Sequence, residues 1–376
     1  MRYLLNTHCD DTTARVCIAD LHTRLCSLGL HATLNDWTAY KEHDIVVFLS
    51  YDHDIERARR ENPNIKVVIA DPKLTSRKNI WAAKQADLLL VSSVEQRDAF
   101  LRLNPNILIY YMFPQTVVAP RQHLDHAGVV VAYQGNRVHL DAMCSSVMPA
   151  LLALAQSRPV ELLCIYNLSH LGRAELSGLE EAGIKVSHVQ WNGDTFIDTL
   201  ARADIGIMPN ELPIRDRQDA LRHTALPIGN FAYEPFDHLV RYKVSTNPGR
   251  LLPFACAGLP VIADFCPSAS QFILDGESGF IVSSPHGWHY ALSRLAESRQ
   301  LRQSCADRLR DRVISTQQGQ AKVFAHACKN LVRRVSPNIP GADTAEDEQR
   351  LFNEYPRPQE TPIRWLRRQL RRLTRR

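Results

Sequence analysis

The feature that most constrains this chain is a series of short runs that are apolar at almost every residue. In the first third of the sequence these runs lie at 2–6, 44–50, 65–71, 86–93 and 107–113. A strand without polar alternation is covered on both faces, as strands in a parallel sheet are. Helical or polar segments separate the runs, so the pattern predicts an α/β domain over residues 1–115.

The same alternation begins again after residues 116–127, which have no periodic pattern and are predicted to be a linker. Strands are then predicted at 128–136, 160–167, 184–191, 203–210 and 261–263, and residues 272–282 are predicted to form a helix end, a glycine-bounded turn and a last strand. Helical segments at 286–313 and 318–335 complete a second α/β domain over 128–335, and the last of them could return to the first domain. A chain of 376 residues is long enough for two domains.

The sequence therefore predicts two Rossmann-like, doubly wound domains. In such sheets, ligands bind beyond the carboxyl ends of the strands. We expect the functional site at these ends, in a cleft between the two domains.

The cysteine pattern bears on the compartment and on metal binding. The nine cysteines are odd in number and scattered, and none of them forms a CxxC pair. This pattern favours a reducing compartment and disfavours a disulfide framework or a zinc site. The N-terminal segment lacks the apolar core of a signal peptide, and no window is apolar enough to span a membrane. We therefore expect a cytoplasmic protein without a bound metal.

The positive charge of the chain is concentrated near its C-terminal end. The formal net charge is +5, and residues 363–376 carry seven arginines and no acid, so the remainder of the chain sums to −2. A nearly neutral body argues against a nucleic-acid-binding face. Residues 336–362 are rich in proline and acid and are predicted to link the tail to the second domain.

This tail has the pattern of an amphipathic helix. Its apolar side consists of Ile363, Leu366, Leu370 and Leu373. Its polar side is made of arginines and is bordered by a tryptophan: Arg367, Arg368, Arg371, Arg372 and Trp365. An apolar stripe opposite arginines is typical of a helix that lies in an anionic membrane surface. The pattern favours peripheral attachment at the inner face of the membrane; a solvated helix and a nucleic-acid patch are the alternatives.

Residues 241–264 have the pattern of an anion-binding helix entrance. The basic and polar side chains of this stretch are Arg241, Lys243, Asn247 and Arg250. A turn at Pro248-Gly249 precedes an apolar helix, which leads into a buried strand. Backbone N–H groups and basic side chains at a helix entrance suit a phosphate or a similar anion.

Four segments of the second half, in order, resemble the C-terminal domain of GT-B-fold glycosyltransferases, especially the retaining family 4. YQGN at 133–136 resembles the glycine turn after the first strand of the donor domain, and ADIGIMP at 203–209 resembles a strand that ends in proline. The segment 247–263 is similar to the family's helix–strand unit, and 273–282 is similar to its last glycine-bounded turn. The first half agrees with the family only in architecture.

The resemblance implies metal-independent transfer of a sugar from a nucleotide-sugar donor, without a cofactor and with retention of configuration. It assigns the donor-binding role to Gly135, Asn136, Arg137, Arg241, Lys243, Asn247 and Arg250. The alternative is that the arginines are ordinary charges on helix surfaces. One departure stands out, because Ser245 and Pro253 occupy the positions of the family's two glutamates. Glu234, Asp237 and His238 are candidates to replace them.

Catalytic candidates follow the strands of the first domain. His8 and Asp10 come after the first strand, and Asp71 comes after the run at 65–71. A base at this edge could assist removal of the acceptor proton; ordinary caps and turns are the alternative. Asp52-His53-Asp54 matches a metal-binding DxD pattern, but it directly precedes a helical segment, so we expect helix N-capping instead.

These observations favour an enzyme that transfers a sugar to a glycan or lipid-linked acceptor in bacterial-type surface polysaccharide or lipopolysaccharide assembly. Two alternatives remain at this point. One is a catalytically degenerate GT-B protein that acts as a binding partner in a glycan-assembly complex. The other is a sugar-nucleotide epimerase on the same fold.

Overall fold

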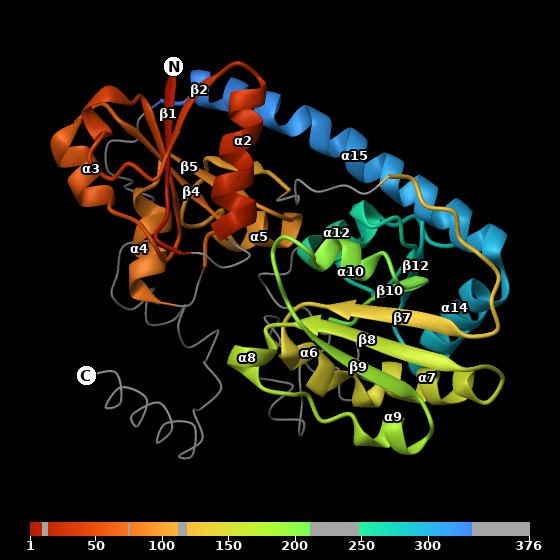
Figure 1. Ribbon diagram of the computed structural model, residues 1–376. Coiled ribbons are helices and arrows are strands. Elements are labelled where there is room, and N and C mark those ends of the chain that lie inside the picture. The colour runs from red at the N-terminus through yellow and green to blue at the C-terminus, as the bar shows by residue number, and fades with distance from the viewer. Residues whose placement is uncertain (10–13, 74–75, 112–118, 211–247, 333–376) are drawn as a thin grey trace, which may run out of the picture. The chain divides into compact units, whose positions relative to one another are not determined.

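The computed structural model describes residues 1–9, 14–73, 76–111, 119–210 and 248–332. These residues form two six-stranded sheets in which every pair of neighbouring strands is parallel (Figure 1). The expected α/β class is therefore confirmed. The tail at 363–376 lies outside the described residues.

The first sheet has the strand order β2-β1-β3-β4-β5-β6. Its strands are β1 (Arg2–Asn6), β2 (His31–Leu34), β3 (Ile45–Leu49), β4 (Lys66–Ala70), β5 (Leu88–Val91) and β6 (Ile107–Ile109). Strand β2 was not predicted, because its four residues, HATL, contain a histidine and a threonine and form no apolar run. The other strands coincide with the apolar runs.

The four α-helices described in this half are α2 (Asp20–Ser27), α3 (Ile55–Glu61), α4 (Arg77–Gln85) and α5 (Val94–Phe100), with a π-helical turn at Arg15–Ala19 and a 3₁₀ turn at Tyr40–Glu42. Two of the four, α4 and α5, begin at serine caps. The Ser76 hydroxyl accepts from the Asn79 backbone N–H, and the Ser93 hydroxyl accepts from that of Gln96. Serine caps of this kind satisfy donors that the first helical turn leaves free.

The second sheet has the strand order β12-β11-β10-β7-β8-β9. Its strands are β7 (Val129–Gln134), β8 (Val160–Tyr166), β9 (Lys185–Gln190), β10 (Ile205–Met208), β11 (Val261–Asp264) and β12 (Phe280–Val282). All six were predicted from the sequence, the last of them as the strand that follows a glycine-bounded turn within 272–282. The order places β7 beside β10, because the chain reverses its direction of winding there.

Helices cover both faces of the second sheet. They are α6 (Arg137–Ala142), α7 (Val147–Ala155), α8 (Leu168–Leu171), α9 (Ser177–Glu181), α10 (Phe196–Leu200), α12 (Leu251–Cys256), α13 (Pro267–Ser270), α14 (Pro285–Glu297) and α15 (Arg299–Lys329), with 3₁₀ turns at Met143–Ser145 and Pro248–Arg250. Residues of α7 and α14 share one core cluster with the sheet, and residues of α10, α12 and α13 share another.

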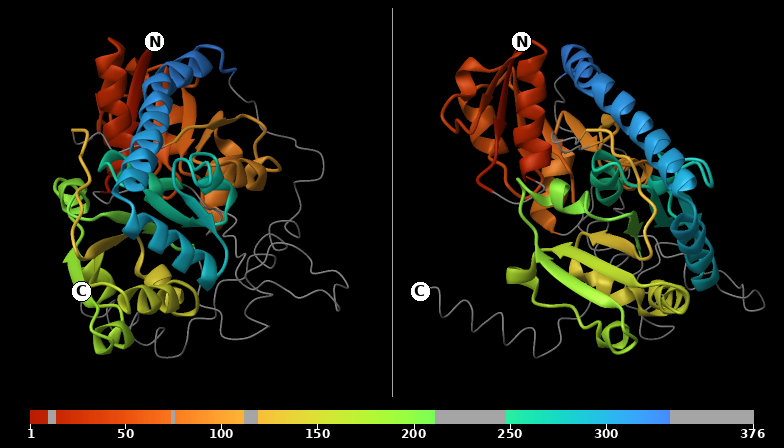
Figure 2. Two further views of the ribbon diagram at one scale, coloured as in Figure 1. Left: turned by 90° about the vertical axis from the view of Figure 1, so that its right-hand side faces the viewer. Right: turned by 45° about the vertical axis from the view of Figure 1, so that its right-hand side comes forward.

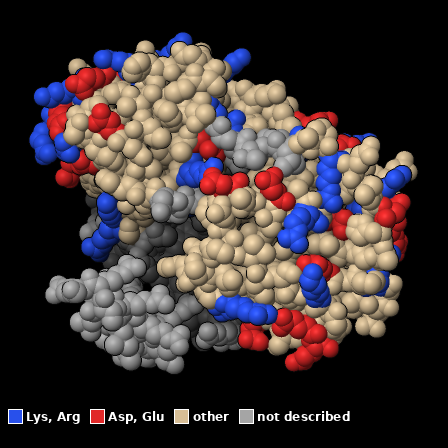
Figure 3. Space-filling view, in the orientation of Figure 1, with Lys and Arg blue, Asp and Glu red and all other residues tan. Residues whose placement is uncertain are grey.

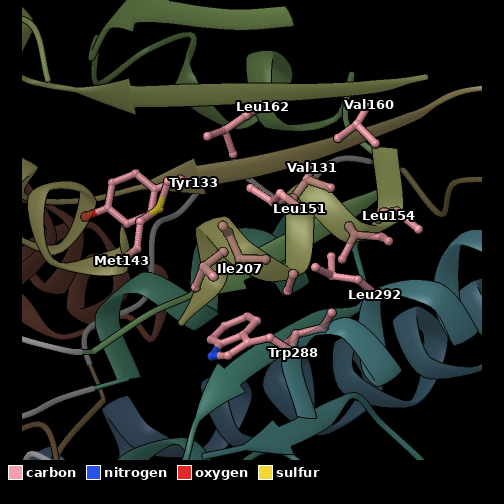
Figure 4. Packing of buried hydrophobic residues seen from close by; sticks show 14 of the residues in the cluster. Val131, Tyr133, Met143, Leu151, Leu154, Val160, Leu162, Ile207, Trp288 and Leu292 are labelled. Atoms are coloured by element: carbon pink, nitrogen blue, oxygen red, sulfur yellow. The ribbon is translucent and has the colours of Figure 1, made fainter. Parts of the chain in front are cut away.

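Figure 4 shows the first of these clusters, in which Leu151 of α7 and Leu292 of α14 pack near Val131 of β7. Trp288 is fully buried in the same cluster. Its indole Nε1 donates to Asp264 Oδ1 at 3.1 Å, so the polar end of the ring is satisfied inside the core.

The last two helices differ from the prediction. The break between them falls at Ser298, whose hydroxyl caps α15, and not near residue 315 (Figure 2). Helix α15 is 31 residues long and continues through Gly319. Its Leu309 belongs to a core cluster of the second sheet, whereas its Phe324 belongs to the cluster that contains Tyr3 of β1.

Two surface properties follow from the described residues. None of the helices there is both long enough and apolar enough to cross a bilayer. On the face drawn in Figure 3, Lys and Arg side chains are interspersed with Asp and Glu side chains.

Candidate functional site

Each sheet has one position at which the order of its strands reverses. In the first sheet this switch point lies between β1 and β3, and in the second it lies between β7 and β10. Ligands of open α/β sheets bind beyond the carboxyl ends of the strands at such points. The segments that follow these four strands carry most of the described candidate residues.

The second-sheet site consists of Gly135, Asn136, Asn210, Arg250 and Asp264. Gly135 follows β7 with φ of 141°, a conformation that favours glycine. A Cβ at this position would lie 2.6 Å from Cδ of Arg250 and 3.1 Å from the Tyr133 hydroxyl. Glycine is therefore required here both by the backbone and by the close approach of Arg250.

Arg250 connects the ends of β7 and β10. Its guanidinium donates to the Pro209 carbonyl and to Asn210 Oδ1, and its own carbonyl accepts from Gln134 Nε2 at 2.9 Å. The side chain is half-buried. Among the described residues no carboxylate forms an ion pair with it, so the switch point holds a cation that no described acid compensates.

Asn210 was not singled out from the sequence, although it directly follows the predicted strand at 203–210. The residue is only 3% exposed, and its Nδ2 has no hydrogen-bond partner among the residues that the structure describes. Its backbone N–H donates to Asp264 Oδ2 at 2.5 Å. Since Asp264 also accepts from Trp288, this carboxylate anchors the site to the core. An unpaired, buried amide donor beside Arg250 suits an anionic or hydroxyl-bearing ligand.

Asn136 and Arg137 begin α6. Oδ1 of Asn136 caps the helix by accepting from the Val138 backbone N–H at 3.0 Å. Arg137 donates through Nη1 to the Leu171 carbonyl at 2.7 Å and pairs with Asp141 at 3.2 Å. The structure therefore brings Asn136 close to Gly135, while Arg137 is bonded to the end of α8.

The first-sheet site consists of Thr7, His8, Trp37 and Asp52. The Asp52 carboxylate follows β3 and accepts from the Thr7 hydroxyl at 2.8 Å and from the His8 backbone N–H at 2.5 Å. The imidazole Nδ1 of His8 lies 3.1 Å from Asp52 Oδ1. The same ring stacks on Trp37, with centroids 3.9 Å apart and an interplanar angle of 18°.

The pKa of Asp52 reflects these contacts. Burial raises it, but the hydrogen bonds from His8 and Thr7 outweigh burial, so the pKa lies below its ordinary value of 3.8. The carboxylate is therefore ionised at neutral pH. Helix N-capping was expected of the motif Asp52-His53-Asp54 as a whole, and within it the Asp52 carboxylate binds the segment after β1 instead of α3. Asp54 occupies the N-cap position of α3, and its side chain makes no capping hydrogen bond.

Asp71 follows β4, on the far side of β3 from β1. It has φ of 49° and is buried. Its carboxylate pairs with Lys73 Nζ at 2.7 Å and accepts from Gln96 Nε2 at 3.3 Å. Asp71 therefore belongs to a local network with Lys73 and Gln96, and none of these contacts joins it to His8.

Several predicted residues lie outside the described part of the chain. They are Asp10, Glu234, Asp237, His238, Arg241, Lys243, Ser245, Asn247, Trp365, Arg367, Arg368, Arg371 and Arg372. Pro253 is described and lies buried within α12. Across the described ranges, no group of three or more His, Cys, Asp or Glu side chains is arranged to hold a metal ion.

Comparisons with known proteins establish the fold. No protein-family model matches the sequence, and no curated protein matches it in sequence. Sucrose-phosphate synthase from Thermosynechococcus elongatus is similar in structure, with a TM-score of 0.58, 13% identity and coverage of 88% of this chain and 98% of the other.

Two further structures agree. HepE from Anabaena, solved in complex with UDP-glucose, gives a TM-score of 0.55 at 14% identity and covers 87% of this chain and 100% of its own. A glycosyltransferase from Rickettsia africae gives a TM-score of 0.54 at 11% sequence identity. The match covers 89% of this chain and 99% of the other. The chain therefore has the GT-B fold of glycosyltransferases. At these identities the similarity concerns the fold and not the reaction.

Proposed function

We propose that this protein is a glycosyltransferase that takes its sugar from a nucleotide-sugar donor. The observation that carries the proposal is Arg250, a half-buried cation held at the switch point of the second sheet beside Gly135 and the unpaired amide of Asn210. A donor diphosphate supplies the negative charge that such a site needs, and the leaving nucleotide develops more of it during transfer. HepE, which shares the fold, was solved with UDP-glucose.

The second domain, residues 128–335, binds the donor in this proposal. The diphosphate is held by backbone N–H groups and basic or amide side chains: Gly135, Asn136, Arg137, Arg241, Lys243, Asn247 and Arg250. The first domain, residues 1–115, binds the acceptor, and His8, Asp10 and Asp71 are its catalytic candidates. Transfer proceeds with retention and needs neither a metal nor a cofactor, as the family resemblance implies.

The test is a panel of UDP-, GDP-, ADP- and CMP-sugars, measured first for a rise in melting temperature and then for turnover. One donor is expected to stabilise the fold by mass action. It should also release its nucleotide slowly with water as acceptor, as a nucleoside diphosphate from a UDP-, GDP- or ADP-sugar and as CMP from a CMP-sugar. The absence of both effects across the panel would refute the proposal.

Activity that is unchanged in EDTA is expected, and activity that requires added Mg²⁺ would contradict metal independence.

Two other functions give different results in the same assay. A degenerate GT-B binding protein would show a melting shift without release of the nucleotide. This alternative is favoured by Pro253, which stands where the family has a glutamate. A sugar-nucleotide epimerase would convert the donor sugar without any acceptor and without releasing the nucleotide.

The acceptor class depends on the C-terminal tail. We propose that residues 363–376 bind the inner face of an anionic membrane, so that the acceptor is lipid-linked and belongs to surface polysaccharide or lipopolysaccharide assembly. Each basic residue near an anionic surface adds about 1 kcal/mol. Flotation with vesicles that contain about one third anionic lipid should fall when residues 363–376 are removed. Equal flotation of the two proteins would remove the membrane proposal.

A further inference from the structure

The first-sheet site contains a histidine–carboxylate pair that the sequence did not reveal. His8 and Asp52 are 44 positions apart but follow the neighbouring strands β1 and β3. Their contact joins His8 Nδ1 to Asp52 Oδ1 at 3.1 Å. The pair therefore lies at the point in the first sheet where an α/β fold binds its ligands.

Two contacts of different kinds fix the imidazole of His8. Asp52 binds the Nδ1 edge, and Trp37 covers one face of the ring at a centroid distance of 3.9 Å. Trp37 in turn stacks at 5.7 Å on Phe48, which belongs to β3 and is fully buried. The position of the ring is therefore tied to the core, although 67% of the side chain remains exposed.

Asp52 is itself held in place. It accepts from the Thr7 hydroxyl and the His8 backbone N–H in addition to the imidazole. Thr7 is anchored on its other side, because its backbone N–H donates to Asn35 Oδ1 at 2.8 Å. The carboxylate is thus positioned before any ligand binds, and 16% of its side chain is exposed.

A carboxylate can only accept a hydrogen bond from Nδ1, so the proton of the neutral imidazole must be on Nδ1. Nε2 then carries the free lone pair and is the basic nitrogen. Nε2 is on the edge of the ring away from Asp52, and no described group forms a hydrogen bond with it. This arrangement is that of a general base with a carboxylate behind it.

We propose that Asp52 is the positioning residue that makes His8 Nε2 the base for the acceptor hydroxyl. The inference rests on the proposed glycosyl transfer and deepens it. It also assigns to Trp37 the role of fixing the plane of the ring. His8 is the catalytic residue in this scheme, and Asp52 acts through it.

The step balances as a simple group transfer. The acceptor oxygen forms a bond to the anomeric carbon of the donor on the face that the diphosphate leaves, as retention requires, and the bond from that carbon to the diphosphate oxygen breaks. The bonding pair leaves with the nucleoside diphosphate, and the acceptor proton moves to His8 Nε2. The imidazolium that results keeps its Nδ1–H directed at the Asp52 carboxylate, which stabilises the new charge.

The first experiment needs no donor. Long-range ¹H–¹⁵N correlation of the histidine rings, recorded at about pH 8.5 where imidazole is neutral, reports which nitrogen carries the proton. The His8 signals are assigned by their loss in His8→Gln. We expect the Nδ1–H form in the wild type and a shift toward the Nε2–H form in Asp52→Asn. A wild type with the Nε2–H form would overturn the proposal.

The second experiment is kinetic and uses water as acceptor with the nucleotide sugar that the panel identifies. His8→Gln is expected to lower kcat about 100-fold, with the donor KM changed less than about twofold. Asp52→Asn should lower kcat at least about tenfold, and Asp52→Glu, which keeps a carboxylate acceptor, should recover part of that loss. The matched histidine control is His31→Gln, because His31 is the first residue of β2 and lies at the amino ends of the parallel strands, whereas His8 follows the carboxyl end of β1. The carboxylate control is Asp98→Asn, because the Asp98 side chain is exposed.

The outcomes separate the two proposals. If the wild type releases nucleotide and His8→Gln does so at the same kcat, His8 is not the general base, and the transferase proposal stands. If Asp52→Asn changes only the donor KM, Asp52 is not a positioning residue for His8. If the wild type turns over no donor of the panel, the transferase proposal fails and the catalytic role of the pair fails with it.

Discussion

Arg250 is the residue on which donor binding depends most directly. Its guanidinium is fixed by the Pro209 carbonyl and by Asn210, and it has no described acidic partner. Arg250→Ala should weaken binding of the nucleotide about 10- to 100-fold, because a charge-assisted hydrogen bond to phosphate contributes about 1.5–3 kcal/mol. Calorimetric titration with UDP, or with the diphosphate of the donor that the panel identifies, measures the change.

The control for this prediction is Arg308→Ala. Arg308 is 57% exposed and pairs with Glu277 at 3.2 Å. Its loss should leave nucleotide affinity unchanged. Equal affinity of Arg250→Ala and the wild type would mean that Arg250 only braces the segments after β7 and β10.

Gly135 tests the same site through the backbone. Gly135→Ala places a Cβ 2.6 Å from Arg250 Cδ at a φ that only glycine adopts easily. The free energy of unfolding should fall by about 1–3 kcal/mol, and nucleotide affinity should fall as well because Arg250 must move. Gly183→Ala is the control, since Gly183 also has positive φ but no atom lies within 4 Å of its Cβ position. Gly183→Ala should lower the free energy of unfolding and leave nucleotide affinity unchanged. Full affinity in Gly135→Ala would contradict this account.

At this scale the sequence identified residues that follow a strand, but not their partners. Gly135 and Arg250 were predicted for one site, and the structure places them in contact. The motif Asp52-His53-Asp54 was assigned to the N-terminus of the following helix, because the sequence pattern shows only near neighbours, and the contacts of Asp52 lie elsewhere. Its real partners, Thr7 and His8, are brought to it by the pairing of β1 with β3.

The turn between β3 and α3 gives the structure an acid-sensitive element. His53 lies in this turn and stacks near Trp81 at 5.8 Å. The pKa of His53 is lowered from 6.5 to about 4, chiefly by burial and also by the charge of Lys78, although Asp52, Asp54 and a backbone hydrogen bond at Lys78 act in the opposite direction. The folded protein therefore holds His53 neutral at a pH where the unfolded chain protonates it.

The sign of the pH effect follows from this difference. Between pH 6.5 and about 4 the unfolded state binds more protons, so stability falls as the pH falls through this range. His53→Gln removes this contribution. Its melting temperature should therefore depend less on pH than that of the wild type, whereas the exposed His31→Gln should follow the wild type. Identical pH profiles for His53→Gln and the wild type would contradict the assignment.

Helix α15 contributes to the cores of both sheets. Phe324 is fully buried, with its ring 6.0 Å from that of Tyr3 and 6.0 Å from that of Tyr110. Phe324→Ala should lower the free energy of unfolding by about 3–5 kcal/mol, because it leaves a cavity in the core of the first sheet. Val323→Ala removes an adjacent side chain that is 53% exposed and should cost little. Denaturant unfolding measures both, and similar losses for the two variants would refute the packing role of Phe324.

Elements were predicted well where one physical signal dominates. Every buried strand was visible as an apolar run, because both of its faces are covered. Strand β2 was missed because its four residues, HATL, alternate polar and apolar side chains and form no apolar run. The break before α15 was misplaced because Ser298 acts as a cap, whereas Gly319, which looks like a breaker, is tolerated inside the helix.

At the scale of the whole molecule, the fold could be derived from the sequence and the reaction could not. Two series of apolar runs predict two parallel sheets, and three solved structures with TM-scores of 0.54 to 0.58 have the same architecture. The domain boundaries and the tail remain predictions. The chemistry depends on contacts between segments far apart in sequence, such as His8 with Asp52, which no local pattern contains.

The central claim is that a nucleotide sugar binds at the switch point of the second sheet. Hydrogen–deuterium exchange, with and without the donor that gives the largest melting shift, tests this claim most directly. We expect slower exchange at the end of β7, after β10 and at the entrance of α12, which are residues 134–138, 209–210 and 248–252. Arg250→Ala should abolish this protection at the same donor concentration. Protection confined to other segments, or none at a saturating donor concentration, would contradict the account.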